Sequence, residues 1–582
     1  MKSIKYLAIL SGALVALSLN SCSESFLDHV PDERTEIDTE QKVVDLLKTA
    51  YPVANFMWVG EISSDNLIDN QAPHLPTKPW DKQILTHYNY GTYDRWDEEL
   101  FNFQPVTLGT YSDSDSPGRI WGGYYASIAT CNAALQAIDE IKAENNGQET
   151  NVLKAARAEA LLIRAYSHFC LVNVFCQAYK DSDLSRRDIG IPYVTEVEDV
   201  VHKDYDRGNV AEVYEKIEAD LLAGLAGIDE VIYTQPKWHF NMNAAHAFAA
   251  RFYLYKRDWA KVVEHANAVL GTDNNTLMNM MMDYSVFTEC STGSEYSLAW
   301  QSPTQNNNLM LIGTYSLVYR RCFGYRYSCA GPAARDVFLI NARHDFWRSY
   351  YVCPIALVSG MCFGSSTYDY GYINSKIFEQ FEYSDKIAGI GYPHIIVRAF
   401  TANELLLERA EAKIMMGQLD AGAEDLCSYW NNSIDRFSES DYKSYYEGGY
   451  INYITKAMIE KWYSEPTHGN CHANWDFTQS NVSPTYVVSA AQVPFMNCIN
   501  EFRRFETMFE GMRFFDLKRW GVEYSHNCGV YSSEVTLGAN DSGRAIEVPW
   551  ETISAGMESS RQASKDNYTN QLIFNEEDFK IK

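Results

Sequence analysis

The sequence predicts a mostly α-helical protein, in which a helical solenoid scaffold carries long irregular loop insertions and a few short strands. Two observations predict this fold class. Apolar residues recur at spacings of three and four in several segments that come in pairs, which is the pattern of amphipathic helices. Long stretches without such a period separate the pairs. An irregular helical domain is the alternative to a solenoid.

Each predicted helix combines an apolar stripe with a residue that starts or ends it. Asp258, Thr401 and Asp420 are placed to cap helix N-termini, and Gly417 is placed to end a helix. Paired helices of this length are typical of tetratricopeptide-like repeats, which stack into solenoids. The predicted helices cover residues 152–178, 209–228, 245–256, 258–269, 401–416 and 420–430.

Three aperiodic stretches rich in Tyr, Asn, Ser, Gly and Trp lie between the helices, at residues 61–111, 271–392 and 448–500. Stretches of this length are usually functional or disordered, and their aromatic content speaks against disorder. We therefore expect ordered insertions packed on one side of the scaffold. Short strands are expected at residues 395–397 and 486–488.

The chain is acidic: its 582 residues include 49 Lys plus Arg and 76 Asp plus Glu, for a formal net charge of −27. Such a charge repels phosphate backbones and anionic lipid surfaces, so no nucleic-acid partner is expected. A neutral ligand meets no such penalty. The 40 tyrosines combine apolar rings with polar tips, which suits binding surfaces.

Residues 1–21 have the pattern of a lipoprotein signal peptide. Lys2 and Lys5 precede an apolar run over residues 7–19, which is shorter than the about 20 residues that span a bilayer. The run ends in Leu-Asn-Ser followed by Cys22, which resembles a lipobox whose cysteine is acylated and begins the mature protein. An ordinary signal peptide followed by a chance cysteine is the alternative.

Catalytic and metal-binding motifs are missing from the sequence. It has no G-x-S-x-G, H-E-x-x-H or G-x-x-x-x-G-K-[ST] pattern, and no C-x-x-C pair of the kind found in zinc ribbons and redox sites. His468, Cys471 and His472 cluster, but no fourth ligand follows at a recognisable spacing. We therefore expect no catalytic residue, no metal and no cofactor. A glycoside hydrolase stays as an alternative, since it needs only two carboxylates about 5 to 10 Å apart.

Three sequence blocks carry a resemblance to a known family. Residues 157–175 read RAEALLIRAYSHFCLVNVF, residues 207–225 read RGNVAEVYEKIEADLLAGL, and residues 503–521 read RRFETMFEGMRFFDLKRWG. These blocks resemble those of the SusD/RagB (SusD-like) family of outer-membrane lipoproteins of Gram-negative bacteria. The resemblance covers essentially the whole chain. It implies a single unit over residues 22–582, with an N-terminal SusD-like part at about 22–290 and a C-terminal RagB/SusD part at about 291–582.

The last block also has a physical interpretation. Its apolar residues form one helical stripe, and its charged residues alternate in sign at intervals of three. An Arg beside each carboxylate favours the ionised form, so the charges are expected to be a structural ladder and not catalytic acids. The charged residues are Glu510, Arg513, Asp516 and Arg519.

The resemblance implies a non-catalytic protein, lipid-anchored in the outer membrane and facing the cell exterior. Such proteins bind oligosaccharide or polysaccharide and deliver it to a partner SusC-like TonB-dependent barrel for uptake. A RagB-type protein that binds peptides is one alternative. A surface glycoside hydrolase and a solenoid adaptor that binds only protein are two others.

Glycan binding requires flat aromatic platforms flanked by polar side chains. The resemblance implies a site opposite the solenoid, on the insertions. For each aromatic ring, packing in the core is the alternative role. The candidate platforms are Trp80, Tyr88, Tyr90, Tyr93 and Trp96, with Tyr325 and Tyr327 from the central insertion. The candidate polar partners are Asp65, Asn66, Asp94 and Arg95.

Overall fold

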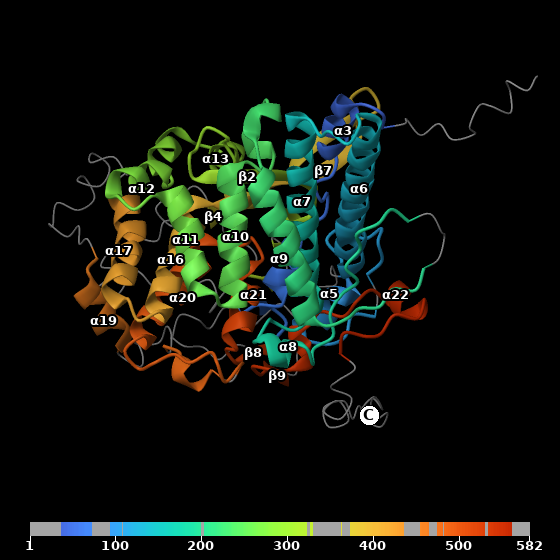
Figure 1. Cartoon of the computed structure of the whole chain (residues 1–582). Coiled ribbons are helices and arrows are strands. Elements are labelled where there is room, and N and C mark those ends of the chain that lie inside the picture. The colour runs from blue at the N-terminus through green and yellow to red at the C-terminus, as the bar shows by residue number, and fades with distance from the viewer. Residues whose placement is uncertain are drawn as a thin grey trace, which may run out of the picture.

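The computed structural model describes residues 37–72, 94–107, 109–198, 203–322, 326–329, 362–363, 373–435, 454–464, 474–480, 482–529 and 533–561. Long helices stand side by side across the molecule, and short strands and loops flank them (Figure 1). The structure therefore confirms the mostly α-helical class with few short strands. No helix within these ranges is long and apolar enough to cross a membrane.

The helices predicted from periodicity are present, and they pack in neighbouring pairs. Helix α7 packs against α9, α10 against α11, and α16 against α17. Asn209, Asp258 and Thr401 accept hydrogen bonds from backbone N–H groups in the first turns of α9, α11 and α16. The bounds are α7 (Asn151–Phe175), α9 (Val210–Gly227), α10 (Met242–Lys256), α11 (Trp259–Leu270), α16 (Ala402–Met415) and α17 (Leu419–Asp435).

Two features of the helices differ from the predictions. Asp420 was expected to cap a helix, but α17 begins at Leu419. Asp420 therefore lies in the first turn, where its negative charge interacts favourably with the helix dipole. The longest helix of the described chain, α6 (Pro117–Glu144), was not predicted. It packs against α7 and α3 (Glu40–Leu47).

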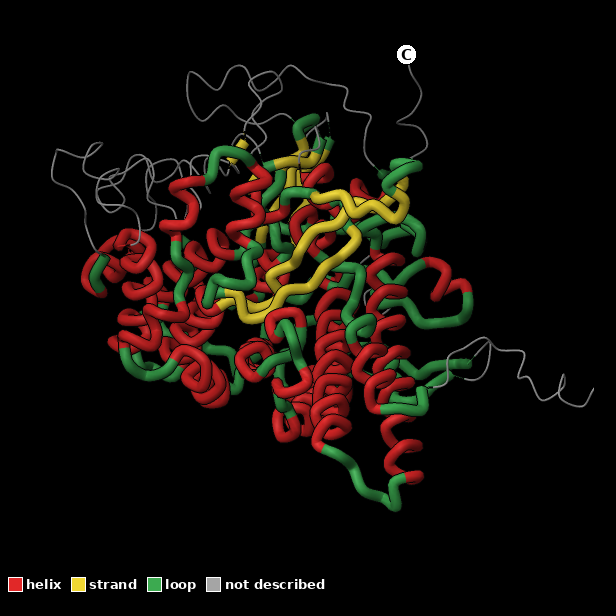
Figure 2. The backbone as a smooth tube through the Cα atoms, turned by 90° about the horizontal axis from the view of Figure 1, so that it is seen from above, coloured by secondary structure: helices red, strands yellow, loops and turns green. Residues whose placement is uncertain are grey.

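A three-stranded antiparallel sheet has the order β2-β7-β6, with β2 (Asn308–Tyr315), β7 (Ile390–Thr401) and β6 (Gln380–Asp385). Strand β7 contains the predicted strand 395–397 and leads directly into α16. The predicted strand 486–488 is wrong, since this segment has no strand pairing. Figure 2 shows the strands running beside the helices. Two-stranded pairs are β1 (Ile68–Asp69) with β3 (Tyr327–Ser328), β4 (Cys362–Phe363) with β5 (Ile373–Asn374), and β8 (Tyr524–Cys528) with β9 (Ser533–Leu537).

The C-terminal block is two helices and not one continuous stripe. Phe509 and Gly511 adopt left-handed φ angles of 65° and 76° and separate the two helices. The turn lies against helix α4, where a Cβ on Gly60 would stand 2.0 Å from the carbonyl oxygen of Gly511. The close approach of these two backbones therefore requires glycine at both positions. The two helices are α20 (Val493–Glu506) and α21 (Met512–Trp520), and α4 is Met57–Ile62.

The remaining elements are short and lie mostly in the insertions and near the chain ends. The helices are α5 (Arg95–Phe101), α8 (Ser182–Ser185), α12 (Asn274–Met280), α13 (Gly293–Trp300), α14 (Val318–Cys322), α19 (Lys456–Ser464) and α22 (Trp550–Ser554). The 3-10 turns are η2 (Glu230–Ile232), η3 (Pro236–Trp238), η4 (Tyr284–Glu289), η7 (Ser375–Ile377), η8 (Phe477–Gln479) and η9 (Ser542–Arg544).

Candidate functional site

The first and central insertions meet at the strand pair β1–β3. Asp69 of β1 is in register with Tyr327 of β3. The neighbouring Arg326 guanidinium lies 3.2 Å from the Asp69 carboxylate and 2.9 Å from that of Glu98 on α5. Candidate residues that are far apart in the sequence therefore belong to one region of the fold.

A second arginine joins the same two insertions. Arg321 of α14 lies 3.0 Å from the Asp94 carboxylate and 3.2 Å from that of Asp97, at the start of α5. Trp58 donates a hydrogen bond of 2.6 Å to Asp97. Burial raises the pKa of Asp97 to about 6, although the charge of Arg321 and this hydrogen bond act in the opposite direction. The start of α5 is thus held by a buried polar cluster.

Three of the predicted ligand contacts are buried. Asn66, Trp96 and Tyr327 are 0%, 3% and 3% exposed. The Arg321 guanidinium lies 4.6 Å from the centre of the Trp96 ring, and the ring centres of Phe101 and Tyr327 are 4.7 Å apart. We assign these three side chains to packing and not to ligand contact, because a ligand on the surface does not reach them.

Asp65 and Asn66 connect the first insertion to the C-terminal block. Arg513 donates two hydrogen bonds, of 2.7 and 2.8 Å, to the Asp65 carboxylate. Arg504 donates one of 2.8 Å to the side-chain oxygen of Asn66. These contacts engage the polar atoms that were predicted to face a ligand, so the two residues have a structural role here.

Two of the predicted contacts among the described residues have mostly exposed side chains, Arg95 at 70% and Asp94 at 53%. Arg95 lies 3.3 Å from the Glu99 carboxylate. Asp94 is also at the surface, where Arg321 binds it. The others lie outside the described residues, and their roles stay predictions. They are the lipidation residue Cys22 and the aromatic residues Trp80, Tyr88, Tyr90, Tyr93 and Tyr325.

A cleft of about 770 Å³ lies between α6, residues 192–198, residues 203–205 and the end of α22. Trp121 and Tyr125 of α6 line it with ring centres 4.8 Å apart, and Glu196 and Glu198 contribute carboxylates. Its volume is within the range of small-molecule sites. The sequence interpretation missed this cleft because α6 was not recognised. The available signal is the Trp/Tyr pair four positions apart, which places both rings on one face of a helix.

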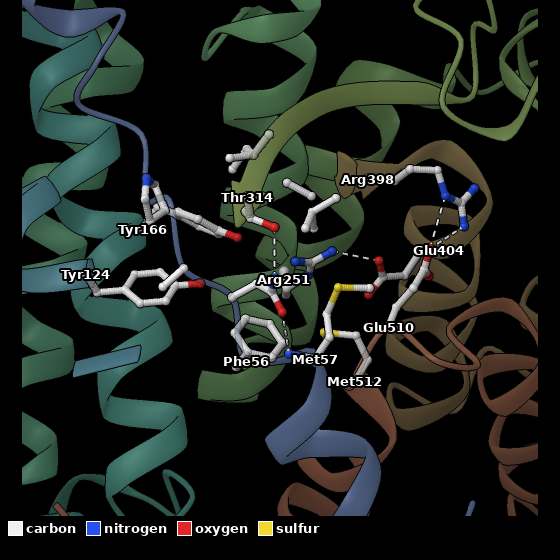
Figure 3. Close-up of a pocket in the computed structure, with 16 residues that line it drawn as sticks. Phe56, Met57, Tyr124, Tyr166, Arg251, Thr314, Arg398, Glu404, Glu510 and Met512 are labelled. Atoms are coloured by element: carbon white, nitrogen blue, oxygen red, sulfur yellow. Dashed lines mark hydrogen bonds and ion pairs between the residues drawn. The ribbon is translucent and has the colours of Figure 1, made fainter. Parts of the chain in front are cut away.

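The interior also contains a small polar cavity, of about 30 Å³ (Figure 3). Arg251 reaches it from α10 and bonds Glu404 at 2.6 Å, while Arg398 bonds Glu510 at 2.7 Å. Figure 3 shows both pairs, and Thr314 of β2 lines the same cavity. The volume suffices for about one or two water molecules, so a sugar ring does not fit.

The predicted charge ladder is only partly present. Asp516 and Arg519 bond at 2.8 Å within α21, but Glu510 bonds Arg398 and Arg513 bonds Asp65 instead. Burial opposes the ionisation of Asp516, yet the guanidiniums of Arg503 and Arg519 outweigh it and lower its pKa. An acid of this strength is unsuited to proton donation near neutral pH.

In the described part of the chain, no three His, Cys, Asp or Glu side chains form a group that could hold a metal ion. The sequence cluster at His468, Cys471 and His472 lies outside the described residues.

Glu61 of α4 is fully buried beneath the turn at Gly511. Its carboxylate accepts hydrogen bonds of 2.9 Å from the Gly511 N–H and of 2.9 Å from the Asn66 amide. Burial nevertheless raises its pKa from 4.5 to about 7. The folded protein therefore holds a proton that the unfolded chain releases between these pH values, and stability falls as the pH rises through this window.

We expect the substitution Glu61→Gln to remove this pH dependence. Relative to the variant, the wild type should lose about 2 to 3 kcal/mol of unfolding free energy between pH 5 and pH 8. Urea unfolding of both proteins at the two pH values measures the difference. If the unfolding free energies of the wild type and the variant differ by the same amount at both pH values, Glu61 does not have a raised pKa in the folded protein.

Comparisons with known proteins give two family matches. A family model described as "Starch-binding associating with outer membrane" matches residues 25–254. A second, described as "SusD family", matches residues 354–581. No curated protein matches the chain.

Solved structures resemble the whole fold. A SusD superfamily protein from Bacteroides thetaiotaomicron VPI-5482 has a TM-score of 0.52 and 17% identity, over 90% of this chain and 100% of that one. A SusD superfamily protein from Bacteroides vulgatus ATCC 8482 has a TM-score of 0.56 and 17% identity, over 90% of this chain and 99% of that one. A further B. vulgatus protein, whose name refers to sugar binding, has a TM-score of 0.56 and 16% identity, over 90% of this chain and 99% of that one. At these identities the likeness establishes the fold alone.

Proposed function

Because the chain belongs to the SusD/RagB family, we propose that it is a cell-surface lipoprotein that binds an oligosaccharide or polysaccharide and delivers it to a TonB-dependent outer-membrane transporter. The protein is anchored by lipid on Cys22 and faces the cell exterior. It binds its ligand without chemical change. The observation that carries the proposal is the pair of family matches, one in each half of the chain.

The chemistry of the chain supports a neutral glycan as the ligand. A net charge of −27 disfavours anionic ligands, whereas an uncharged sugar is not repelled. Two regions offer aromatic rings beside polar side chains. One is the junction of the insertions, where Arg95 is exposed. The sequence candidates Trp80 and Tyr88 precede Arg95 in the same insertion and lie outside the described residues. The other is the α6 cleft, with Trp121 and Tyr125.

Native gels that contain single polysaccharides test ligand binding. We expect the wild type to be retarded by its ligand. The double variant Trp80→Ala/Tyr88→Ala should bind about tenfold more weakly, since each lost stacking platform is worth about 0.5 to 1.5 kcal/mol. Its melting temperature should stay close to that of the wild type.

Two further variants locate the site. Trp121→Ala tests the α6 cleft, and Trp550→Ala is the control, because Trp550 is 57% exposed and does not line the cleft. Unchanged retention of Trp80→Ala/Tyr88→Ala together with a loss in Trp121→Ala would move the site to the cleft. New reducing ends in the incubated polysaccharide would indicate a hydrolase, and binding of peptides alone would indicate a RagB-type protein.

A further inference from the structure

The hairpin formed by β6 and β7 leaves large apolar side chains in solvent. The exposed fractions are 43% for Phe381, 52% for Tyr383, 100% for Ile387, 59% for Ile390 and 54% for Tyr392. Single exposed apolar residues are ordinary, whereas a cluster of them marks an interaction site. We call these five side chains the hairpin surface.

Aromatic rings occupy both faces of the hairpin. Glu382 is in register with Tyr392, so the next residue on either side of Glu382, Phe381 or Tyr383, points to the opposite face. The rings of Phe381 and Tyr383 are 4.9 Å apart, and the ring of Tyr392 lies 5.3 Å from that of Tyr315 on β2. On both faces of the hairpin, these aromatic side chains are therefore about half exposed.

Strand β6 is also an edge strand. It pairs with β7 on one side, and none of the described strands pairs with its other side. The backbone groups along such an edge are ready to pair with a further strand. The hairpin thus offers apolar anchors and a hydrogen-bonding edge together, which is the combination used in recognition by strand addition.

This combination fits a protein better than a glycan or a lipid. Ile387 and Ile390 are branched aliphatic side chains, which lack the flat face that stacks on a sugar ring. An open sheet edge does not enter the hydrocarbon of a bilayer, because its backbone groups find no partners there.

The position of the hairpin indicates which protein binds the hairpin surface. The described chain begins at residue 37, and the segment that joins it to Cys22 spans at most about 50 Å. Helix α3 follows, and the Val53 carbonyl just beyond it accepts a hydrogen bond of 2.8 Å from Tyr315, beside Tyr392. Figure 1 shows α3 and β7 at the same end of the molecule. The hairpin surface therefore adjoins the end of the fold to which the anchor attaches.

We propose that the hairpin surface docks on the extracellular side of the partner TonB-dependent barrel. The inference rests on the proposed function, which supplies the barrel, and adds the surface that contacts it. The barrel contributes an apolar groove or a free strand edge, and Ile387 at the hairpin tip is the most exposed anchor.

Photocrosslinking in the native host tests the contact directly. The photoreactive residue p-benzoylphenylalanine replaces Tyr383 or Tyr392 in the full-length, membrane-anchored protein, and mass spectrometry identifies the products. We expect a product with the TonB-dependent barrel from both positions and none from Trp550, which is 57% exposed on α22. A product with a second copy of this chain or with lipid, or no product, would overturn the proposal.

A triple variant tests the energetic role of the hairpin surface. Phe381→Ser/Tyr383→Ser/Ile387→Ser should reduce the barrel recovered by detergent pull-down about tenfold or more, since apolar anchors supply most of the affinity of an interface. Retention in the polysaccharide gel should be unchanged. The matched control is Leu222→Ser/Val487→Ser/Trp550→Ser, whose side chains are 47%, 70% and 57% exposed elsewhere on the surface.

The outcomes separate the two proposals. If the wild type and the triple variant recover the barrel equally, the hairpin surface is not the contact, although the proposed function stands. If the wild type recovers no barrel, the proposed delivery to a transporter fails, and the docking proposal fails with it.

Discussion

Replacing Arg503 by Met should lower the unfolding free energy by about 3 to 5 kcal/mol, because it removes one partner from a buried ion-pair network. The Arg503 side chain is 0% exposed, and its guanidinium lies 2.8 Å from the Asp516 carboxylate and 3.4 Å from that of Glu404. Met fills much of the same space, but it has no positive charge, so the buried Asp516 and Glu404 carboxylates lose one of their charged partners. Urea unfolding at neutral pH measures the loss.

The control is Arg186→Met, which removes an ion pair with a similar N–O distance that lies on the surface instead of in the interior. Arg186 lies 2.6 Å from the Glu215 carboxylate, and the two side chains are 48% and 55% exposed. Exposed pairs contribute about 0 to 1 kcal/mol, so this variant should unfold almost like the wild type. Equal losses in the two variants would show that burial of the network does not determine its energetic role.

Replacing Cys22 by Ala should move nearly all of the protein from the membrane fraction to the soluble fraction. Each acyl methylene buried in the bilayer contributes about 0.8 kcal/mol, so several acyl chains hold a protein firmly without a spanning helix. The described residues contain no helix able to replace such an anchor. Fractionation of host membranes followed by immunoblotting measures the shift.

Two steps make this result decisive. An alkaline carbonate wash removes variant protein that is held only through a partner barrel. Cys290→Ala is the matched control, since Cys290 is a half-buried free cysteine far from the predicted lipobox, and its loss should leave fractionation unchanged. Washed membranes that still retain the Cys22→Ala variant would contradict lipidation at this residue.

The sequence predicted helices best where apolar residues recur without interruption. The stripes of α10 and α16 are of this kind, and one of the two stripes of α7 is interrupted only at Ser167. These three helices begin and end close to the expected residues. The stripe of α6 is broken by Gly122, Gly123 and Ser127, and this helix was missed. Gly123 lets α6 approach the chain at Ala54, where a Cβ would stand only 2.6 Å from the Ala54 Cβ. Tertiary packing, and not local pattern, stabilises this helix.

The sequence could not predict which side chains of the candidate site are buried and which are exposed. Arg95 and Trp96 are adjacent, yet the Arg95 side chain is 70% exposed and Trp96 is 3% exposed. Trp96 turns inward because Arg321, from a distant segment, lies over its ring. A sequence pattern marks residue types that suit a ligand, but a distant partner decides which of them reach the surface.

The sequence by itself determined the helical class, the family and the aromatic insertions, because periodicity and motif blocks are local properties of the chain. Only the tertiary structure decided the partners of the charged residues. Glu510 and Arg513 were expected to pair within one helix, but they bind Arg398 and Asp65, which are 112 and 448 positions away. The left-handed turn at Gly511 separates Glu510 from the helix, and buried charges then pair with whatever opposite charge the fold brings within reach.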